Sequence, residues 1–216
     1  MTLPDEPPSP GLCPLCGQQL FGWIALPPAP GAHGEPHERI IDRCENCGTA
    51  LGRGREIDAV AEWEAICRPG VGGSGREIAV PDRRSLQAAI GVEGWAAIEQ
   101  SPGHLVLTPS SLELLAAKNG HRIERREWPV WGRNQAWMWQ TLLNGLTFHP
   151  NFAREARAGR LRAANARSRF AFAIDAVVTV LGAPLVALLS FPLEVIAALA
   201  RRGGELRAVA VRSSGA

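Results

Sequence analysis

The sequence contains no tyrosine and a single lysine, Lys118, so arginine supplies almost all of its positive charge. Across 216 residues, 23 lysine and arginine side chains stand against 21 acidic ones, which leaves a formal net charge of only +2. A balance this close to neutral gives no strong overall attraction to nucleic acid. The composition, 46% hydrophobic and 20% charged, favours a folded core over disorder.

The first ten residues lack both the basic start and the apolar stretch of a signal peptide. They are acidic and rich in proline, so we expect a short disordered lead over residues 1–10. Without export, the protein is expected in the cytoplasm. There, paired cysteines bind metal more often than they form disulfides.

Four of the five cysteines occur in two CxxCG motifs, one starting at Cys13 and the other at Cys44. The two thiolates of each motif can bind the same ion, and the glycine allows a tight turn whose amides point at sulfur. Two such turns predict a tetrahedral four-sulfur site with no open position, which is typical of structural zinc in a zinc ribbon. A redox-active CxxC would need a surrounding βαβ pattern that is absent here. The predicted zinc ligands are Cys13, Cys16, Cys44 and Cys47.

The remaining candidates for chemistry are isolated. His33 and His37 lie between the two motifs, where four cysteines already fill the metal shell, so we predict loop histidines. Cys67 follows an apolar pair on a predicted helix and is expected to be a small buried side chain. His149 precedes Pro150 and has no visible partner in the sequence. No catalytic residue is therefore predicted.

Short helices and strands alternate through the middle of the chain. Thr108 followed by Pro109 is a favourable helix start, and Gly120 is a typical helix stop. Asp82 is a plausible cap for another short helix, which Gly91 ends. The predicted order is helix 58–66, strand 77–80, helix 83–90, strand 105–107, helix 108–120, strand 121–128 and a closing strand 204–212.

Several short motifs within this part occur in a characteristic order. The run begins with Arg68-Pro-Gly and a strand ending in Pro81-Asp-Arg-Arg-Ser, and continues through Gly94-Trp95 to His104-Leu-Val-Leu-Thr-Pro-Ser-Ser-Leu and Asn119-Gly. This order resembles the last part of a class I S-adenosylmethionine-dependent methyltransferase. The closing strand is similar to the end of that family, so the resemblance extends from residue 58 to 212. It implies part of a Rossmann-like sheet.

The cofactor-binding half of that family has no counterpart here. The family holds its cofactor upstream, by a glycine-rich turn after the first strand and an acidic residue after the second. A βαβ unit takes roughly 30 residues, more than residues 48–67 provide. Residues 70–75 match the pattern GxGxxG, but a predicted helix precedes them and a predicted strand follows. This order favours a turn over a nucleotide-binding loop. The glycines at 52 and 54 also lack the preceding strand. S-adenosylmethionine binding is therefore not expected.

The last third contains an aromatic helix and an apolar run. The helix, within residues 132–150, either packs on the sheet or faces a lipid or partner. The apolar run, residues 171–193, contains one charge, Asp175, and is interrupted by Gly182 and Pro184, which predicts two helices. It can lie on a membrane surface, span a bilayer, or cover the sheet. Arginines that precede it favour an anionic surface; the residues predicted to contact it are Arg160, Arg162, Arg167 and Arg169.

The predicted fold is α/β, with an N-terminal zinc ribbon, a partial Rossmann-like methyltransferase sheet and a C-terminal apolar helix pair. The predicted parts are a lead (1–10), the ribbon (11–54), the α/β domain (55–131 and 204–212) and a helical region (132–203). We predict a non-catalytic protein that binds a partner protein or a membrane surface, with nucleic acid less favoured. The alternative is a methyltransferase acting alone or with a partner that supplies the cofactor site.

Overall fold

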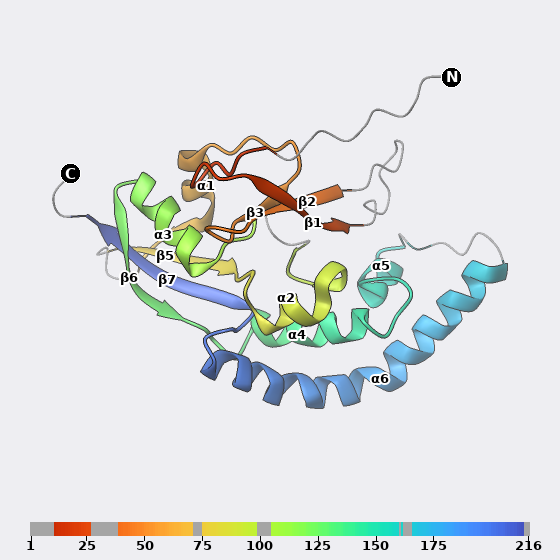
Figure 1. Ribbon diagram of the computed structural model, residues 1–216. Coiled ribbons are helices and arrows are strands. Elements are labelled where there is room, and N and C mark those ends of the chain that lie inside the picture. Colours follow the sequence, from red (N-terminus) through yellow and green to blue (C-terminus); the bar gives the residue numbers. More distant parts are fainter. Residues whose placement is uncertain are drawn as a thin grey trace, which may run out of the picture.

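The computed structural model describes residues 11–26, 39–70, 75–98, 105–159, 161 and 166–213. It folds them into two antiparallel sheets with helices packed around them (Figure 1). The mixed α/β class is thus confirmed. The predicted lead and the loop histidines at 33 and 37 lie outside the described residues.

The first sheet brings the two cysteine motifs together. It contains β1 (Leu20–Leu26), β2 (Arg39–Cys44) and β3 (Ala50–Gly52) in that order. Leu20 pairs with Cys44 in the antiparallel register. The first motif ends just before β1 and the second begins at the end of β2, so this register places both at the same end of the sheet.

The second sheet has the strand order β4-β5-β7-β6, and every neighbouring pair is antiparallel. Its strands are β4 (Cys67–Pro69), β5 (Arg76–Pro81), β6 (His121–Glu127) and β7 (Glu205–Arg212). Because β5 and β6 both oppose β7, they run in the same direction with β7 between them. Helices α1 (Ala59–Ile66) and α3 (Pro109–Lys118) supply Trp63, Leu112 and Leu115 to one core with the strands.

The glycine run at residues 70–75 joins two strands. Helix α1 ends at Ile66 and β4 follows at once, so Cys67 is the first strand residue rather than a helical one. The amide of Gly70 donates to the carbonyl of Gly75 at 2.9 Å, where β4 and β5 pair. The predicted turn itself, residues 71–74, lies outside the described residues, and the elements on either side of it are two strands instead of a helix and a strand.

The two sheets share one core. Ala50 and Val106 exchange backbone hydrogen bonds of 2.9 and 2.8 Å, and Leu107 forms a parallel bridge with Asp82. The strand predicted at 105–107 exists only as these two bridges. Buried residues of the first sheet and its cysteine motifs also pack in the same apolar clusters as those of the second sheet and its helices.

One predicted helix start is wrong. Helix α2 (Leu86–Gly91) is capped by Ser85, whose hydroxyl accepts from the amide of Ala88 at 3.0 Å. The Asp82 carboxylate is fully buried, accepts from Trp128 Nε1 at 3.2 Å, and burial raises its pKa. The partly buried indole takes one oxygen of this carboxylate, and the other accepts from the amide of Arg84 at 2.9 Å, in the turn that precedes the helix. A single 3-10 turn (Val92–Gly94) follows α2.

Three helices form a layered lower part of the molecule. Helix α4 (Arg133–Asn144) lies between α2 and α6 (Ala166–Leu199), with α5 (Phe152–Arg157) near one end (Figure 1). Helix α6 has 34 residues, which corresponds to about 50 Å. The predicted helix pair is therefore wrong.

Helix α6 continues through the position where a break was expected. Pro184 and Pro192 both lie inside it, and each removes one backbone hydrogen bond. Packing against α4 holds the segment helical, and Trp139 donates its indole N–H to the carbonyl of Ala183 at 3.0 Å. The helix curves around α4 (Figure 1).

A buried polar network attaches α6 to the fold. Gln87 Nε2 donates to Glu194 Oε2 and to the carbonyl of Asn134, each at 2.8 Å. The other oxygen of Glu194 accepts from the amide of Gly204 at 3.1 Å. Burial raises the pKa of Glu194. The network joins α2, α4, α6 and the start of β7, and its side chains are wholly buried.

We expect Gly204→Ala to destabilise the protein by about 2 kcal/mol. A Cβ at this position would lie 2.3 Å from Gln87 Cδ, which must shift away from Glu194. Gly182→Ala is the control, because its Cβ meets no atom closer than 3.9 Å and alanine favours helix. Urea denaturation measures both, and equal midpoints for the two variants would contradict the close approach.

Candidate functional site

The two cysteine motifs adopt the same turn. Gly17 donates its amide to the carbonyl of Cys13 at 2.8 Å, and Gly48 does the same to Cys44 at 3.0 Å. Both glycines have positive φ, +74° and +79°. This conformation is easily reached only by glycine, which explains the residue after the second cysteine of each motif.

The four sulfur atoms converge on one point. Cys13 Sγ lies 3.6 Å from Cys47 Sγ, Cys16 Sγ lies 3.4 Å from Cys44 Sγ, and all four lie within 4.8 Å of one another. None of them is in a disulfide. A tetrahedral ion with metal–sulfur bonds of about 2.3 Å separates its sulfurs by about 3.8 Å. The four cysteines can therefore hold a metal ion.

Backbone amides and sulfur–sulfur hydrogen bonds surround these four sulfur atoms. The amides of Leu15 and Cys16 point at the sulfur of Cys13, as the motif predicts. The hydrogen bond with Cys47 lowers the pKa of Cys13 and raises the pKa of Cys47 to about 12. Metal binding requires the deprotonated thiolate, so a divalent cation would displace the protons of these thiols.

The second cysteine motif is also attached to the helical part of the molecule. Thr108 Oγ1 donates to the carbonyl of Cys47 at 2.7 Å, and Arg83 Nε donates to the carbonyl of Gly48 at 2.6 Å. These bonds connect the sulfur cluster to the start of α3 and to the loop before α2. Cys67 is not part of the cluster, and burial raises its pKa to about 11.

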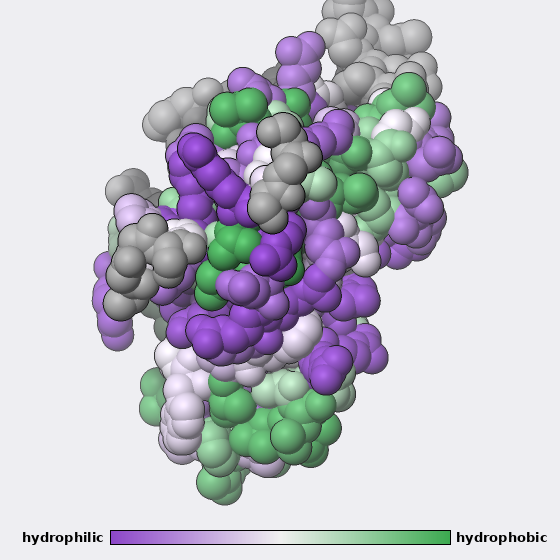
Figure 2. Space-filling view, turned by 90° about the vertical axis from the view of Figure 1, so that its left-hand side faces the viewer, coloured by the Kyte–Doolittle hydropathy of each residue, from purple (hydrophilic) through white to green (hydrophobic). Residues whose placement is uncertain are grey.

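Helix α6 is the second notable feature. Within the described residues, Arg167–Leu199 is the helix long and apolar enough to cross a membrane, by length and composition. The outward side chains are apolar, and Leu188 and Leu199 are 74% and 81% exposed. We define the apolar face as Val177, Val180, Leu181, Leu185, Leu188, Leu189, Ile196 and Leu199. Hydrophobic surface gathers at the lower end of the molecule in Figure 2, where α6 lies in Figure 1.

The inward side of α6 carries its two carboxylates and a serine. Asp175, Ser190 and Glu194 are all buried against the rest of the protein. A helix on the surface of a soluble domain shows the opposite pattern, with its apolar residues inward. Helix α6 therefore has the inverted polarity, with its carboxylates buried inward and its large apolar side chains exposed.

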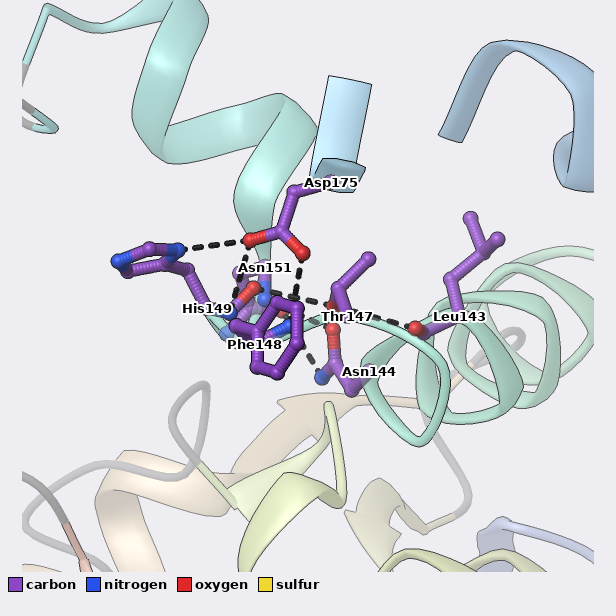
Figure 3. A network of polar contacts seen from close by, with 7 residues as sticks. All are labelled: Leu143, Asn144, Thr147, Phe148, His149, Asn151 and Asp175. Carbon is purple, nitrogen blue, oxygen red and sulfur yellow. Dashed lines mark hydrogen bonds and ion pairs between the residues drawn. The ribbon is translucent and has the colours of Figure 1, made fainter. Parts of the chain in front are cut away.

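Asp175 illustrates this inversion (Figure 3). Its carboxylate accepts from the amides of Phe148 and His149 at 2.8 and 3.0 Å, and contacts Nδ1 of His149 at 2.7 Å. The sequence offered His149 no visible partner, and the structure supplies one from a helix that is distant in the chain. The one charge within the apolar run 171–193 thus faces the turn after α4, away from the apolar face.

The aromatic helix α4 packs inward. Trp137 and Met138 are buried, and the indole of Trp137 lies in the core cluster of the first sheet. Of the two interpretations of this helix, packing within the protein holds for these side chains.

Arginines flank α6 at both ends. Arg167 and Arg169 are exposed near its first turn, whereas Arg160 and Arg162 lie outside the described residues. Arg201 and Arg202 follow its last turn and are also exposed.

A comparison with protein-family models finds no match to this chain, and comparisons with curated proteins and with solved structures likewise find none. The interpretation of the site therefore rests on its own residues. Sequence reasoning missed the contacts made between distant segments, namely Gln87 with Glu194, His149 with Asp175, and Arg83 with the second cysteine motif.

We predict that Cys44→Ser abolishes stoichiometric metal binding and lowers the thermal unfolding midpoint, because serine leaves an open position in the sulfur cluster. Cys67→Ser is the matched control and should keep the metal, since Cys67 lies outside the cluster. Elemental analysis of protein purified without chelator measures the content. Wild-type protein without bound metal would contradict the prediction.

Proposed function

We propose that this chain is a non-catalytic, zinc-stabilised protein that lies on an anionic membrane surface through helix α6. The observation that supports it most is the inverted polarity of α6, with Asp175 and Glu194 buried inward and leucines outward. Exposing such a face to water costs about 25 cal/mol of free energy per Å² of apolar surface. A lipid surface removes that cost.

The charges beside the apolar face favour a membrane over a protein partner. Arg167 and Arg169 at one end and Arg201 and Arg202 at the other can contact lipid phosphates while the leucines insert. An interfacial position also suits the inner face, because the buried carboxylates keep their partners on α2 and on the turn after α4. A true span would require α6 to leave those partners exposed to lipid.

Zinc is the ion that the four-cysteine cluster favours, because a closed shell of four thiolates suits a d¹⁰ cation in a structural role. We propose a zinc-ribbon role for the first sheet on this basis. The ion would hold together the loops next to β1 and β2, which supply two ligands each. Its loss would loosen the end of the module that Thr108 and Arg83 contact.

We expect Leu185→Gln combined with Leu188→Gln to reduce sedimentation with anionic liposomes by at least about tenfold, because each substitution removes inserted apolar area. Both side chains are exposed, so folding should be unaffected. Leu12→Gln with Val60→Gln is the control, since these are similarly exposed apolar residues far from α6 in the sequence.

Replacing Arg160, Arg162, Arg167 and Arg169 with glutamine should weaken the same binding, at about 1 kcal/mol per arginine. High salt should release the wild-type protein, whereas a spanning helix would resist the wash. Wild-type protein that stays in the supernatant at low salt would refute the membrane proposal and leave the apolar face to a protein partner.

The methyltransferase alternative rests on the resemblance and on the second sheet, where β5 and β6 flank the closing strand β7. The glycine run that matches GxGxxG lies between the paired strands β4 and β5, a context that does not suit a dinucleotide-type loop, which needs a helix after it. We therefore propose that the scaffold resembles a methyltransferase without performing catalysis.

The isolated chain should show no S-adenosylmethionine binding at millimolar concentration. The reason is the lack of a glycine-rich turn between strand and helix, together with its acidic partner. Titration calorimetry and thermal shift measure this directly. A saturable rise in unfolding midpoint with cofactor concentration would favour the enzyme instead.

A further inference from the structure

A cleft at the C-terminal end of α6 is lined by four arginines. It has a volume of about 660 Å³ and lies between the loop before α2, the turn after α6 and the side chain of Trp23. Alanines and a valine supply the apolar part of its wall. We call it the arginine cleft and define it by Arg83, Arg84, Arg201 and Arg202.

The positive charge of this cleft is only partly offset by the protein, because Asp82 and Glu45 attract Arg83 from beyond ion-pair distance. None of the ion pairs found among the described residues involves any of its four arginines. A second cleft, on the sheet, shows the contrast. There Arg133 and Arg207 both pair with the buried carboxylate of Glu205, at 2.9 and 2.6 Å. Arginines concentrated in a concave site whose lining contains no carboxylate favour an anionic ligand.

Arg83 is held in place by two contacts, and its charged side chain is partly buried. Its guanidinium stacks on Trp23 at 5.5 Å, and its Nε donates to the carbonyl of Gly48. Burial lowers its pKa and the nearby Arg43 adds to this effect, whereas Glu45, Asp82 and Cys47 oppose it. A guanidinium stays charged in proteins, so its burial without an ion-pair partner leaves a charge that an anionic ligand can compensate.

The two arginine-bearing segments are fixed to each other. The amide of Leu86 donates to the carbonyl of Arg202 at 2.9 Å, and Arg202 Nε donates to the carbonyl of Arg84 at 3.0 Å. The cleft is therefore assembled before any ligand arrives. Preorganised sites of this kind bind with less loss of entropy.

Arg201 occupies a backbone position that favours glycine. Its φ is +55°, and the amide of Arg202 closes the end of α6 by donating to the carbonyl of Ala197 at 2.7 Å. This is the position where helices commonly place glycine, and a side chain there is strained. Glycines follow only at 203 and 204, after Arg202, so Arg201 occupies a position where glycine would be less strained.

We propose that the arginine cleft binds the phosphomonoester headgroup of an anionic lipid, whose acyl chains extend over the apolar face of α6. Four guanidiniums suit a doubly charged phosphate, which they can bind in bidentate fashion. Leu199, the last residue of the apolar face, is two positions from Arg201, so one amphiphile can contact both. This proposal rests on the proposed function, because the lipid is taken from the membrane that α6 contacts.

The test compares vesicles of phosphatidylcholine that contain either phosphatidate or phosphatidylglycerol at matched surface charge. Wild-type protein should bind phosphatidate vesicles about tenfold more tightly. The variant Arg84→Gln with Arg201→Gly should lose this preference and still bind phosphatidylglycerol vesicles through the apolar face. Equal wild-type affinity for both lipids, or a preference that survives in the variant, would overturn the proposal.

The control removes the same charge elsewhere. Arg122→Gln with Arg212→Gln takes two exposed arginines from β6 and β7 and should keep the phosphatidate preference. Arg201→Gly alone should raise the thermal unfolding midpoint while it weakens phosphatidate binding, because glycine relieves the positive φ. If this variant is more stable than the wild type and still binds phosphatidate more weakly, unfolding is excluded as the cause of the weaker binding.

A further measurement with a water-soluble ligand distinguishes failure of this site from failure of membrane binding. If the wild-type protein ignores all vesicles, the proposed function fails, and the cleft is then tested by calorimetry with a short-chain, water-soluble phosphatidate. Binding that Arg84→Gln with Arg201→Gly abolishes would support the cleft as a phosphomonoester site, and no binding would refute it. Equal affinity for inorganic phosphate would identify free phosphate as the ligand and overturn the lipid assignment.

Discussion

The buried amide–carboxylate contact between Gln87 and Glu194 is the interaction on which the arrangement of the lower layers depends. It joins the second helix of the chain to the last one, and the same carboxylate holds the amide that starts β7. A carboxylate without partners at this depth would cost several kcal/mol. The inner side of α6 is therefore specified by polar contacts, and its outer side is left to leucine and valine. The uncovered apolar face follows directly from this division.

The cysteine cluster was predictable because its determinants are local. Each motif encodes a turn within five residues, and glycine at 17 and 48 supplies the positive φ that the turn needs. The start of α3 was predictable for the same reason, since Thr108 and Pro109 act on their own helix. Where neighbouring residues decide the conformation, the sequence pattern was sufficient.

Features decided by distant residues were not predictable in this way. Asp82 and Ser85 can both cap α2, but Asp82 is divided between the nearby amide of Arg84 and the indole of Trp128, which is far along the chain. Pro184 suggested a helix break, but packing of α4 against α6 outweighs the lost hydrogen bond. His149 lacked a partner until the fold brought Asp175 to it. In each case a long-range contact overrides a sound local rule.

In chain order, helix α6 lies between two neighbouring strands of one sheet, because it belongs to the connection from β6 to β7. Both of its ends are thus tied to the protein body, unlike a terminal anchor on a linker. On a bilayer, such a helix would set the tilt and rotation of the whole molecule. The cysteine-bearing sheet lies on the opposite side of the fold (Figure 1) and would then face the aqueous phase, where other molecules can reach it.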